Sequence, residues 1–536
     1  MMAAPTSTRS AFLDRLRDTP GYWDVVVVGG GATGLGTAVD AAARGYSTLL
    51  VEASDFGKGT SSRSTKLVHG GVRYLQQGDL RLVLDALRER GHLIRNAPHL
   101  VHDQPFVVPC YKRWERSYYG VGLKLYDWLA GRLGFGRSRL LSPDETLDHL
   151  PTVNPDGLRG GVLYHDGQFD DSRLAVNLAQ TVADLGGVPL NYMRVLRLLK
   201  QEGRVRGVLA EDVETGATQE VLARVVVNAT GVFTDAVRRM DEPGADPVIR
   251  PSQGVHLVLD RSFLPGDSAL MLPHTDDGRV LFAVPWHGRV VVGTTDTPVD
   301  RIDLEPRPLD DEVAFLLEHA GRYLTRQPTE ADVLSTFAGL RPLVSEGGRK
   351  RTASISRDHW LNVSDSGLVT ITGGKWTTYR KMGEDAVDAA AKTAGLERRP
   401  SVTTHRRVHG WLSGPPTDPG LAVYGGDAPA LRQLAAEMPG GADPLHPGLP
   451  YCRAMATWAA RYEMARTVDD VLARRTRALL LDARASIEAA PEVAALLAAE
   501  LGHDASWEAD QVGAFTEIAR GYVVGTVPAL IEPLSV

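Results

Sequence analysis

The amino-acid sequence predicts a mixed α/β (α+β) protein with three kinds of structure along one chain. Near the N-terminus, a βαβ pattern begins with four consecutive valines. Residues 250–300 alternate apolar and polar side chains, which predicts an antiparallel sheet. From about residue 451 onward the pattern becomes helical and alanine-rich. With 536 residues, the chain is long enough for roughly two to four domains.

The βαβ pattern covers residues 24–52 and carries a dinucleotide-binding signature. After the valines come Gly29, Gly31 and Gly34 in G-x-G-x-x-G spacing, then a helical segment and a second strand that ends at Glu52. The first glycine permits a tight turn, the second lets a pyrophosphate approach the backbone, and the third lets helix and strand pack closely. The helix N-terminus attracts phosphate, and the acid binds ribose hydroxyls. We therefore predict a Rossmann-like unit for a dinucleotide without a ribose 2′-phosphate, although glycines so spaced also mark plain turns.

Composition argues against several other classes of protein. A net charge of −7 with 43% hydrophobic residues is typical of a globular protein and predicts no nucleic-acid partner. The cysteines Cys110 and Cys452 have no motif partner, so we expect neither a disulfide nor a metal site. The N-terminal stretch lacks a long apolar core, and no apolar run reaches the ~18 residues of a spanning helix. We expect a cytoplasmic location.

Residues 54–75, SDFGKGTSSRSTKLVHGGVRYL, are rich in Gly, Ser and Thr with basic side chains between them. A solvated loop has this composition. Its position directly after the acid-ended strand nevertheless favours a loop whose hydroxyls, amides and Lys66 wrap a phosphate-bearing cofactor.

Several motifs resemble those of the FAD-dependent glycerol-3-phosphate dehydrogenases, which are amino-acid oxidase-like flavoproteins. The likeness runs from residue 24 to about residue 482. The motifs are HGGVRYL (69–75), VNATGVF (227–233), VGTTD (292–296), AGLRPL (338–343) and GGKWTTYR (373–380). The resemblance implies an FAD-binding domain (20–100, 180–250, 335–398), a substrate-binding domain (101–179, 251–334) and a C-terminal helical cap domain (399–536).

The resemblance also implies FAD as the cofactor, bound without a covalent link. A helix that follows the GGKWTT turn would direct its N-terminus at the flavin, where Lys375 adds positive charge; an ordinary strand–helix turn is the alternative. The residues expected to contact FAD are Gly29, Gly31, Gly34, Glu52, Thr60, Ser61, Ser62, Lys66, His69, Gly71, Val195, Ala229, Thr230, Gly231, Gly374, Lys375 and Thr377.

The implied reaction oxidises sn-glycerol 3-phosphate to dihydroxyacetone phosphate by hydride transfer from C2 to flavin N5. Arginine suits the phosphate because its planar guanidinium makes two parallel hydrogen bonds. We take His256 as the base, since an unperturbed imidazole titrates near neutral pH, although a strand histidine is commonly structural. The expected catalytic residues are His256, Arg341 and Lys375. The expected substrate-binding residues are Arg73, Tyr74, His256, Arg341 and Arg357.

Alternatives stay open at this point. A glycerol-3-phosphate oxidase would pass electrons to O₂ in place of a quinone, an amino-acid or sarcosine-type oxidase would share the fold, and a non-catalytic flavin-binding protein would lack substrate. A quinone acceptor would require peripheral contact with the inner face of the cell membrane, and a homodimer is compatible with the sequence. The basic-aromatic stretch 111–119 either touches a membrane or partner or is a folded loop. Arg474 and Arg475 either lean toward the active-site mouth or lie on an exposed helix face.

Overall fold

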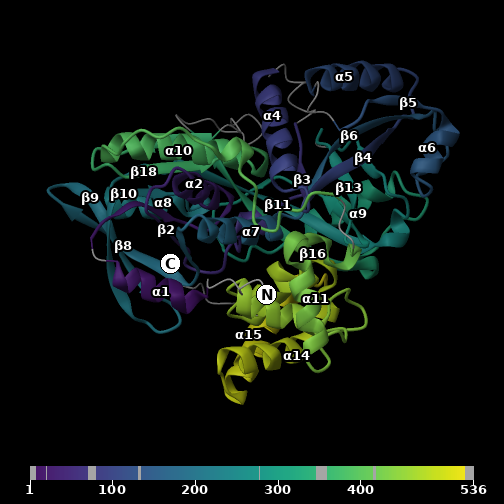
Figure 1. Ribbon diagram of the computed structural model, residues 1–536. Helices are drawn as coiled ribbons and strands as arrows, with labels where there is room; N and C mark the ends of the chain where they lie inside the picture. Colours follow the sequence, from purple (N-terminus) through teal and green to yellow (C-terminus); the bar gives the residue numbers. More distant parts are fainter. Residues whose placement is uncertain are drawn as a thin grey trace.

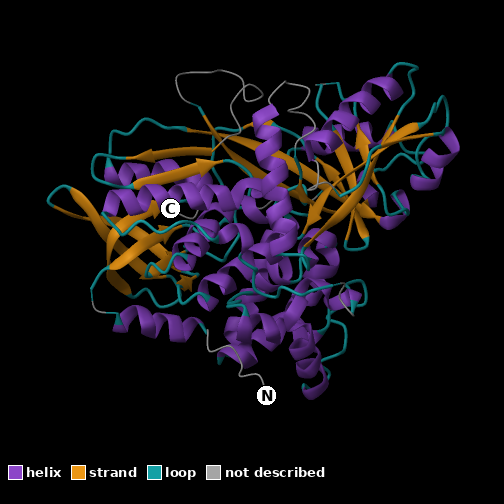
Figure 2. Cartoon of the chain, turned by 45° about the horizontal axis from the view of Figure 1, so that its top comes forward, coloured by secondary structure: helices purple, strands orange, loops and turns teal. Residues whose placement is uncertain are grey.

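The computed structural model describes residues 8–19, 21–70, 80–130, 135–276, 278–345, 359–414 and 418–525. These segments form two large sheets with helices packed around them and a separate group of C-terminal helices (Figure 1). Figure 2 shows strands on either side of a central group of helices. The mixed α/β class predicted from the sequence is confirmed.

The first sheet has a parallel centre that follows from the buried valine run. The four valines are at most 6% exposed, as expected of a strand covered on both faces. The hairpin of β8 (Met193–Gln201) and β9 (Arg204–Asp212) continues this sheet from β10. Its main strands, in spatial order, are β17 (His359–Val363), β18 (Val369–Gly373), β10 (Thr218–Asn228), β1 (Trp23–Val28), β2 (Thr48–Val51) and β7 (Val188–Leu190).

The helices that pack on or beside this sheet include α2 (Ala32–Ala43), α7 (Asp171–Asp184), α8 (Thr234–Asp241) and α10 (Tyr379–Ala394). The first turns of α2 and α10 lie against each other at Gly36 and Gly383. A Cβ on Gly36 would lie 2.7 Å from the carbonyl oxygen of Tyr379, and one on Gly383 would lie 2.5 Å from the backbone of Gly36. The two helices therefore begin side by side. The N-terminal α1 (Arg9–Asp18) packs near β7.

The second sheet contains the antiparallel region predicted over residues 250–300. β16 (Val333–Val344) pairs along β11, and β5 (Arg139–Leu141) pairs with β6. The main strands, in order, are β15 (Thr297–Pro298), β11 (Ile249–Asp260), β14 (Arg289–Gly293), β13 (Leu281–Trp286), β12 (Ala269–Leu272), β4 (Val101–Pro109), β6 (Gly161–Phe169) and β3 (Leu67–Val68). Around it lie α4 (Leu80–Asn96), α5 (Glu115–Ala130), α6 (Pro143–His149) and α9 (Asp310–Gly321).

Two strands lie in a different sheet from the one implied by the expected domain division. β3 and β16 fall within segments expected to belong to the FAD-binding domain, yet both pair in the second sheet. The reason is that an alternating pattern marks a strand without naming its partner. β16 is held by β11 from Ile249 opposite Val344 to Leu259 opposite Val333.

The C-terminal helices have a hydrophobic cluster of their own, which also includes inward side chains of β11, β14 and β16. In the part of the chain that the structure describes, every helix is too short or too polar to cross a bilayer. The helices are α11 (Ala428–Glu437), α12 (Arg453–Tyr462), a π-helical turn (Asp470–Arg475), α13 (Ala478–Leu481), α14 (Ala483–Leu501) and α15 (Ala505–Arg520).

Candidate active site

A cavity of about 1170 Å³ opens where the carboxyl ends of β1, β2, β10 and β18 approach β11 and β16. Ligands of open parallel sheets bind at the carboxyl ends of the strands. One part of the wall comes from the β1–α2 turn and the end of β2, and another from residues 57–69. Further parts of the wall come from the two long strands of the second sheet, the turn before α10 and residues 294–307.

The three glycines of the N-terminal motif lie where the predicted roles require them. Gly29 has a φ of +112°, and a Cβ there would lie 2.6 Å from the carbonyl oxygen of Ala229. A Cβ on Gly34 would collide with the carbonyl oxygen of Gly29. At Gly31 the nearest atom is Oγ of Ser61 at 3.1 Å, and the glycine lines the cavity. We call the turn formed by these three glycines the glycine cradle. Of the three, only Gly31 leaves room beside it for a pyrophosphate.

Glu52, at the end of β2, lines the cavity and is fixed by two backbone amides. Its Oε2 accepts from the amide of Gly30 at 2.6 Å, and its Oε1 accepts from the amide of Ser54 at 2.9 Å. Burial raises the pKa of Glu52, while the two amides oppose the shift. Each carboxyl oxygen keeps a further lone pair that can accept from a ribose hydroxyl.

Two helix N-termini reach the cavity wall together. α2 contributes Ala32 and Thr33, and the turn into α10 contributes Lys375 and Thr377. Because the first turns of α2 and α10 are in backbone contact, their partial positive charges act on the same region. Gly374, with a φ of +63°, also lines the wall and permits this turn.

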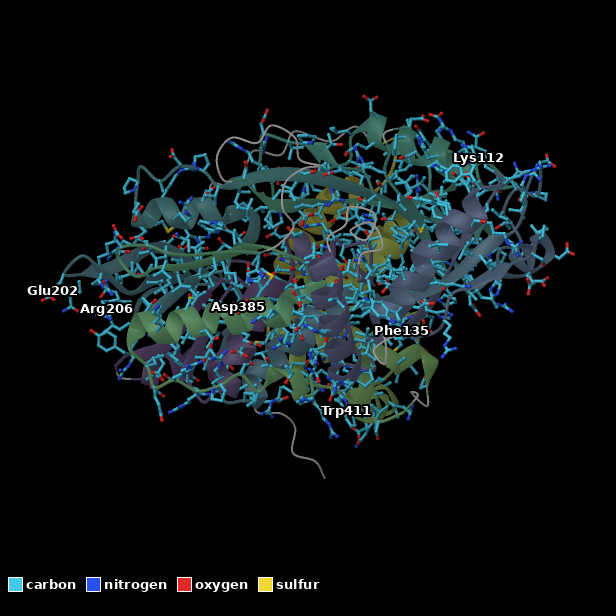
Figure 3. All side chains as sticks on the ribbon, turned by 90° about the horizontal axis from the view of Figure 1, so that it is seen from above. Lys112, Phe135, Glu202, Arg206, Asp385 and Trp411 are labelled. Atoms are coloured by element: carbon cyan, nitrogen blue, oxygen red, sulfur yellow. The ribbon has the colours of Figure 1, made fainter. Side chains whose placement is uncertain are left out.

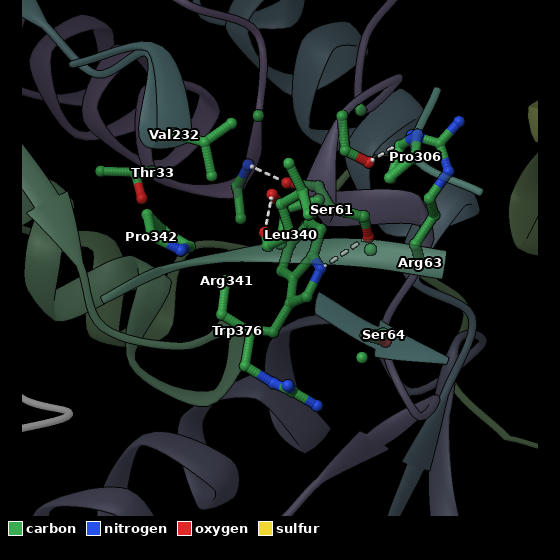
Figure 4. A pocket seen from close by; sticks show the side chains of 18 of the residues that line it. Thr33, Ser61, Arg63, Ser64, Val232, Pro306, Leu340, Arg341, Pro342 and Trp376 are labelled. Atoms are coloured by element: carbon green, nitrogen blue, oxygen red, sulfur yellow. Dashed lines mark hydrogen bonds between the residues drawn. The ribbon is translucent and has the colours of Figure 1, made fainter. Parts of the chain in front are cut away.

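The loop after β2 is fastened on three sides. Thr60 donates from its hydroxyl to the carbonyl of Leu340 on β16 at 2.6 Å. Ser61 accepts at Oγ from the amide of Ala32 at 2.9 Å, and its carbonyl accepts from the indole of Trp376 at 2.8 Å (Figure 4). The loop therefore joins α2, β16 and the start of α10 into one wall.

The structure does not place Lys66 on a phosphate. Its ammonium lies 2.8 Å from both carboxyl oxygens of Asp171 and donates to the carbonyl of Ser62 at 2.7 Å. The side chain is fully buried, and burial lowers its pKa while Asp171 opposes the shift. Lys66 thus pairs inside the protein, where α7 begins, and it does not line the cavity.

His256, on β11, is buried and neutral. Its Nε2 lies 2.9 Å from the hydroxyl of Thr65, and its ring stacks on Phe337 with centroids 4.8 Å apart. Among the described residues, Nδ1 has no hydrogen-bond partner. Burial lowers the pKa of His256 well below its ordinary value, and the charges of Lys66 and Arg341 lower it further. A neutral imidazole can accept a proton.

Arg341, on β16, presents a guanidinium to the same cavity (Figure 4). Its Nη2 donates to the carbonyl of Thr295 at 2.9 Å and to the hydroxyl of Thr294 at 3.1 Å. Nη1 lies 3.3 Å from Oδ1 of Asp296. The side chain remains about one-quarter exposed (25%), so a ligand can reach it. These hydrogen bonds fix the orientation of the guanidinium group, and its positive charge stays accessible from the cavity.

The remaining predicted residues divide into three groups. Ser62 and Gly34, like Lys66, are outside the cavity lining. Gly71, Arg73, Tyr74 and Arg357 lie outside the described residues. The cavity brings together Gly29, Gly31, Glu52, Thr60, Ser61, His69, Val195, Ala229, Thr230, Gly231, His256, Arg341, Gly374, Lys375 and Thr377.

Thr65 is a site residue that the sequence did not single out. It lines the cavity and bonds His256 across 191 residues of sequence. Its only signal was membership of the hydroxyl-rich loop, because the contact with β11 exists only in the folded chain.

Arg474 and Arg475 neither lean toward the cavity mouth nor lie on an exposed face. Both are buried and pair with Asp55, three residues after Glu52, at 2.5 and 2.6 Å. Burial would raise the pKa of Asp55, but Arg475 and Arg474 lower it to about 2. These ion pairs hold the C-terminal helices to the loop that follows β2.

Two family models match the chain. The model described as FAD dependent oxidoreductase matches residues 24–380, and that of the C-terminal domain of alpha-glycerophosphate oxidase matches residues 420–508. The mitochondrial glycerol-3-phosphate dehydrogenase of Mus musculus is 41% identical over 529 residues, covering 92% of this chain and 72% of that protein. The Arabidopsis thaliana enzyme is 42% identical over 528 residues, covering 90% of this chain and 84% of that protein.

A solved structure extends the similarity to the fold. The glycerol-3-phosphate dehydrogenase from Bacillus halodurans complexed with FAD superposes with a TM-score of 0.80 at 30% identity, covering 97% of this chain and 99% of that one. FAD is thus the cofactor, and the glycine cradle, Glu52 and the paired helix N-termini fit its dinucleotide. The chain belongs to the family of FAD-dependent glycerol-3-phosphate dehydrogenases.

Proposed function

We propose that this protein oxidises sn-glycerol 3-phosphate to dihydroxyacetone phosphate in the cavity described above. One observation carries the proposal: a neutral buried histidine and an accessible arginine share a cavity with a dinucleotide cradle. They lie on the adjacent strands β11 and β16. The names of the relatives support the same substrate.

Arg341 binds the substrate phosphate. Its guanidinium is held flat between the Thr294–Asp296 segment and β11, so little side-chain freedom is lost on binding. A phosphate dianion also carries the charge opposite to that of the guanidinium, which stays accessible from the cavity. The phosphate end of the substrate is thereby fixed relative to His256.

FAD, when bound, supplies the hydride acceptor. The C2 hydroxyl proton passes to Nε2 of His256, the nitrogen that is hydrogen-bonded to Thr65 in the free protein. A bound phosphate dianion raises the pKa of His256 because it opposes the cations that lower it. Substrate binding therefore brings the base closer to the pH at which it works best.

Lys375 and the N-terminus of α10 supply positive charge at the wall opposite the second sheet. This charge stabilises the electron-rich form of the cofactor. The substrate roles of Arg73, Tyr74 and Arg357 stay predictions.

We further infer that the electrons pass to a quinone at a membrane surface, and that the protein is cytoplasmic and peripheral on the inner face of the cell membrane. The relatives are named dehydrogenases, which supports an acceptor other than O₂. A glycerol-3-phosphate oxidase is the second candidate, favoured by the family description that matches residues 420–508. A homodimer stays a prediction.

A comparison of acceptors tests this proposal. Purified holoprotein receives glycerol 3-phosphate with either a short-chain quinone or O₂ as the sole acceptor. We expect quinone reduction with little hydrogen peroxide, and no turnover with glycerol or glycine. Peroxide formation at a rate equal to quinone reduction would identify an oxidase, and no turnover with either acceptor would exclude the proposed substrate.

A further inference from the structure

The helix α5 and the turn directly before it carry a row of exposed apolar side chains. The row consists of Trp114, Tyr118, Val121, Leu125 and Trp128, which are 53%, 53%, 72%, 43% and 76% exposed. Steps of four and three residues put these side chains on one face of a helix. A contiguous exposed apolar row of this kind marks an interaction surface.

The opposite face of α5 already holds the helix to the protein. Tyr119 and Leu123 pack in a cluster with strands β4 and β6, and Tyr126 packs with α4. The hydroxyl of Tyr126 donates to Asp166 at 2.8 Å. The orientation of the helix is therefore fixed from inside, and the outer row is not needed for packing.

Positive charge surrounds the row. Residues 111–140 contain seven basic and two acidic side chains, although the whole chain has a net charge of −7. Lys112, Arg113 and Lys124 are exposed. The acidic Glu115 is buried and lies 3.0 Å from His274, so it does not offset them at the surface.

We propose that α5 and the turn before it dock in the headgroup region of an anionic lipid bilayer, with the helix lying in the membrane plane. Tryptophan and tyrosine favour this interface, and basic side chains are drawn to anionic headgroups. Such helices bury one apolar face to a depth of about 5–10 Å. A protein partner fits less well, because the core of a protein interface is depleted in charged residues, whereas Lys112, Arg113 and Lys124 are exposed beside this row.

The position of α5 suits this occupant. The helix lies at the outer edge of the second sheet (Figure 1), and Lys112 lies at the end of the molecule away from Glu202 and Arg206 (Figure 3). The cluster beneath α5 includes Phe106 and Tyr164, which also line the cavity. Docking would thus bring the bilayer within one layer of side chains of the cavity wall.

Binding to vesicles tests the proposal without reference to catalysis, although its biological meaning rests on the proposed quinone acceptor. Wild-type holoprotein is sedimented with vesicles of phosphatidylcholine and phosphatidylglycerol in equal parts. We expect binding that weakens in high salt or on pure phosphatidylcholine. The double variant Trp114→Ser/Trp128→Ser should partition at least about tenfold less, because affinity scales with buried apolar area.

A matched control removes exposed apolar side chains elsewhere. The variant Tyr22→Ser/Leu309→Ser changes residues that are 47% and 50% exposed and should bind vesicles as the wild type does. Undiminished binding by the α5 variant, or no wild-type binding to anionic vesicles, would overturn the proposal, and the second result would point to a protein partner. Bleaching of the flavin by glycerol 3-phosphate without vesicles reports separately on the proposed function, and the α5 variant should keep it.

Discussion

His256 is a residue whose surroundings decide its chemistry. Burial and the charges of Lys66 and Arg341 hold its pKa well below its ordinary value, so the ring stays neutral at physiological pH. The sequence predicted a histidine that titrates near neutral pH, and the structure moves that titration to more acid pH. The lower pKa makes the free histidine a weaker base, and the substrate phosphate that we propose at Arg341 would strengthen it.

The variant His256→Asn should slow flavin reduction by about 10²–10⁴-fold, the usual contribution of a positioned base. Since the pKa of His256 lies well below its ordinary value, the wild-type rate should stay level through neutral pH and fall only at more acid pH, where the imidazole is protonated. Rapid mixing at saturating glycerol 3-phosphate, repeated across pH, measures the rate of flavin reduction in the variant and the pH dependence of the wild-type rate. An acid limb that survives in the variant would assign the proton to another group.

Arg341→Lys should raise the KM for glycerol 3-phosphate by at least roughly tenfold, because a hydrogen bond to a charged group contributes about 1.5–3 kcal/mol. The flavin content should not change. Arg432→Lys, at a side chain that is 53% exposed on α11, is the matched control and should leave KM unaltered. An unchanged KM for Arg341→Lys would remove this residue from the substrate site.

Residue roles were predictable where they depend on local sequence. Gly29, Gly31 and Glu52 lie at the cavity because their spacing along one βαβ unit is itself the signal. The pairing of Lys66 with Asp171 joins residues 105 apart, and that of Arg475 with Asp55 joins residues 420 apart. No local pattern records such pairs, so these basic residues were given surface or phosphate roles that burial excludes.

At the scale of elements, two glycines of the βαβ unit should differ in effect: Gly34 is needed for packing, and Gly31 is needed for cofactor binding. Gly34→Ala should lower both the melting temperature and the flavin content, because its Cβ would collide with the backbone of Gly29. Gly31→Val should fold but purify without flavin, since its side chain meets little protein and fills the cavity. Thermal melts and the ratio of flavin to protein absorbance measure the two effects.

Gly513→Ala is the control for this pair, because a Cβ on this glycine of α15 meets no atom within 4 Å. It should leave the flavin content unchanged and should not lower the melting temperature, because alanine favours a helix more than glycine does. A Gly31→Val protein that purifies fully yellow would show that the pyrophosphate does not approach this glycine.

The type of each element was more predictable than its partners. The antiparallel strands over residues 250–300 and the C-terminal helices follow from their periodicity. The placement of β3 and β16 in the second sheet does not, because strand pairing over long sequence distances depends on the assembled core. That placement matters for the site, since β16 brings Arg341 beside β11.

At the scale of the whole molecule, buried ion pairs hold the C-terminal helices to the loop that follows β2. Asp55→Ala should destabilise the protein by about 3–5 kcal/mol, because it leaves two buried arginines without their shared partner. The exposed pair of Asp85 and Arg88 gives a control, and Asp85→Ala should cost at most about 1 kcal/mol. Unfolding in urea, followed by flavin release, measures both.

The ion pairs of Asp55 with Arg474 and Arg475 also predict how the stability of the protein depends on pH. Because the folded pKa of Asp55 is lowered to about 2 from an ordinary 3.8, its stabilisation is present above 3.8 and is lost as the pH falls through about 2. The Asp55→Ala variant should lack this part of the acid dependence. Equal losses for the buried and the exposed variants would show that the connection contributes little.

Anaerobic rapid mixing of the yellow holoprotein with glycerol 3-phosphate tests the central claim, which is that this cavity oxidises that substrate through FAD. The account predicts loss of the flavin absorbance in a single turnover, at a rate that saturates with substrate. Glycerol lacks the phosphate for which we propose Arg341 as the binding residue, so it should leave the absorbance unchanged. Persistent absorbance with glycerol 3-phosphate, or equal bleaching by glycerol, would contradict the account.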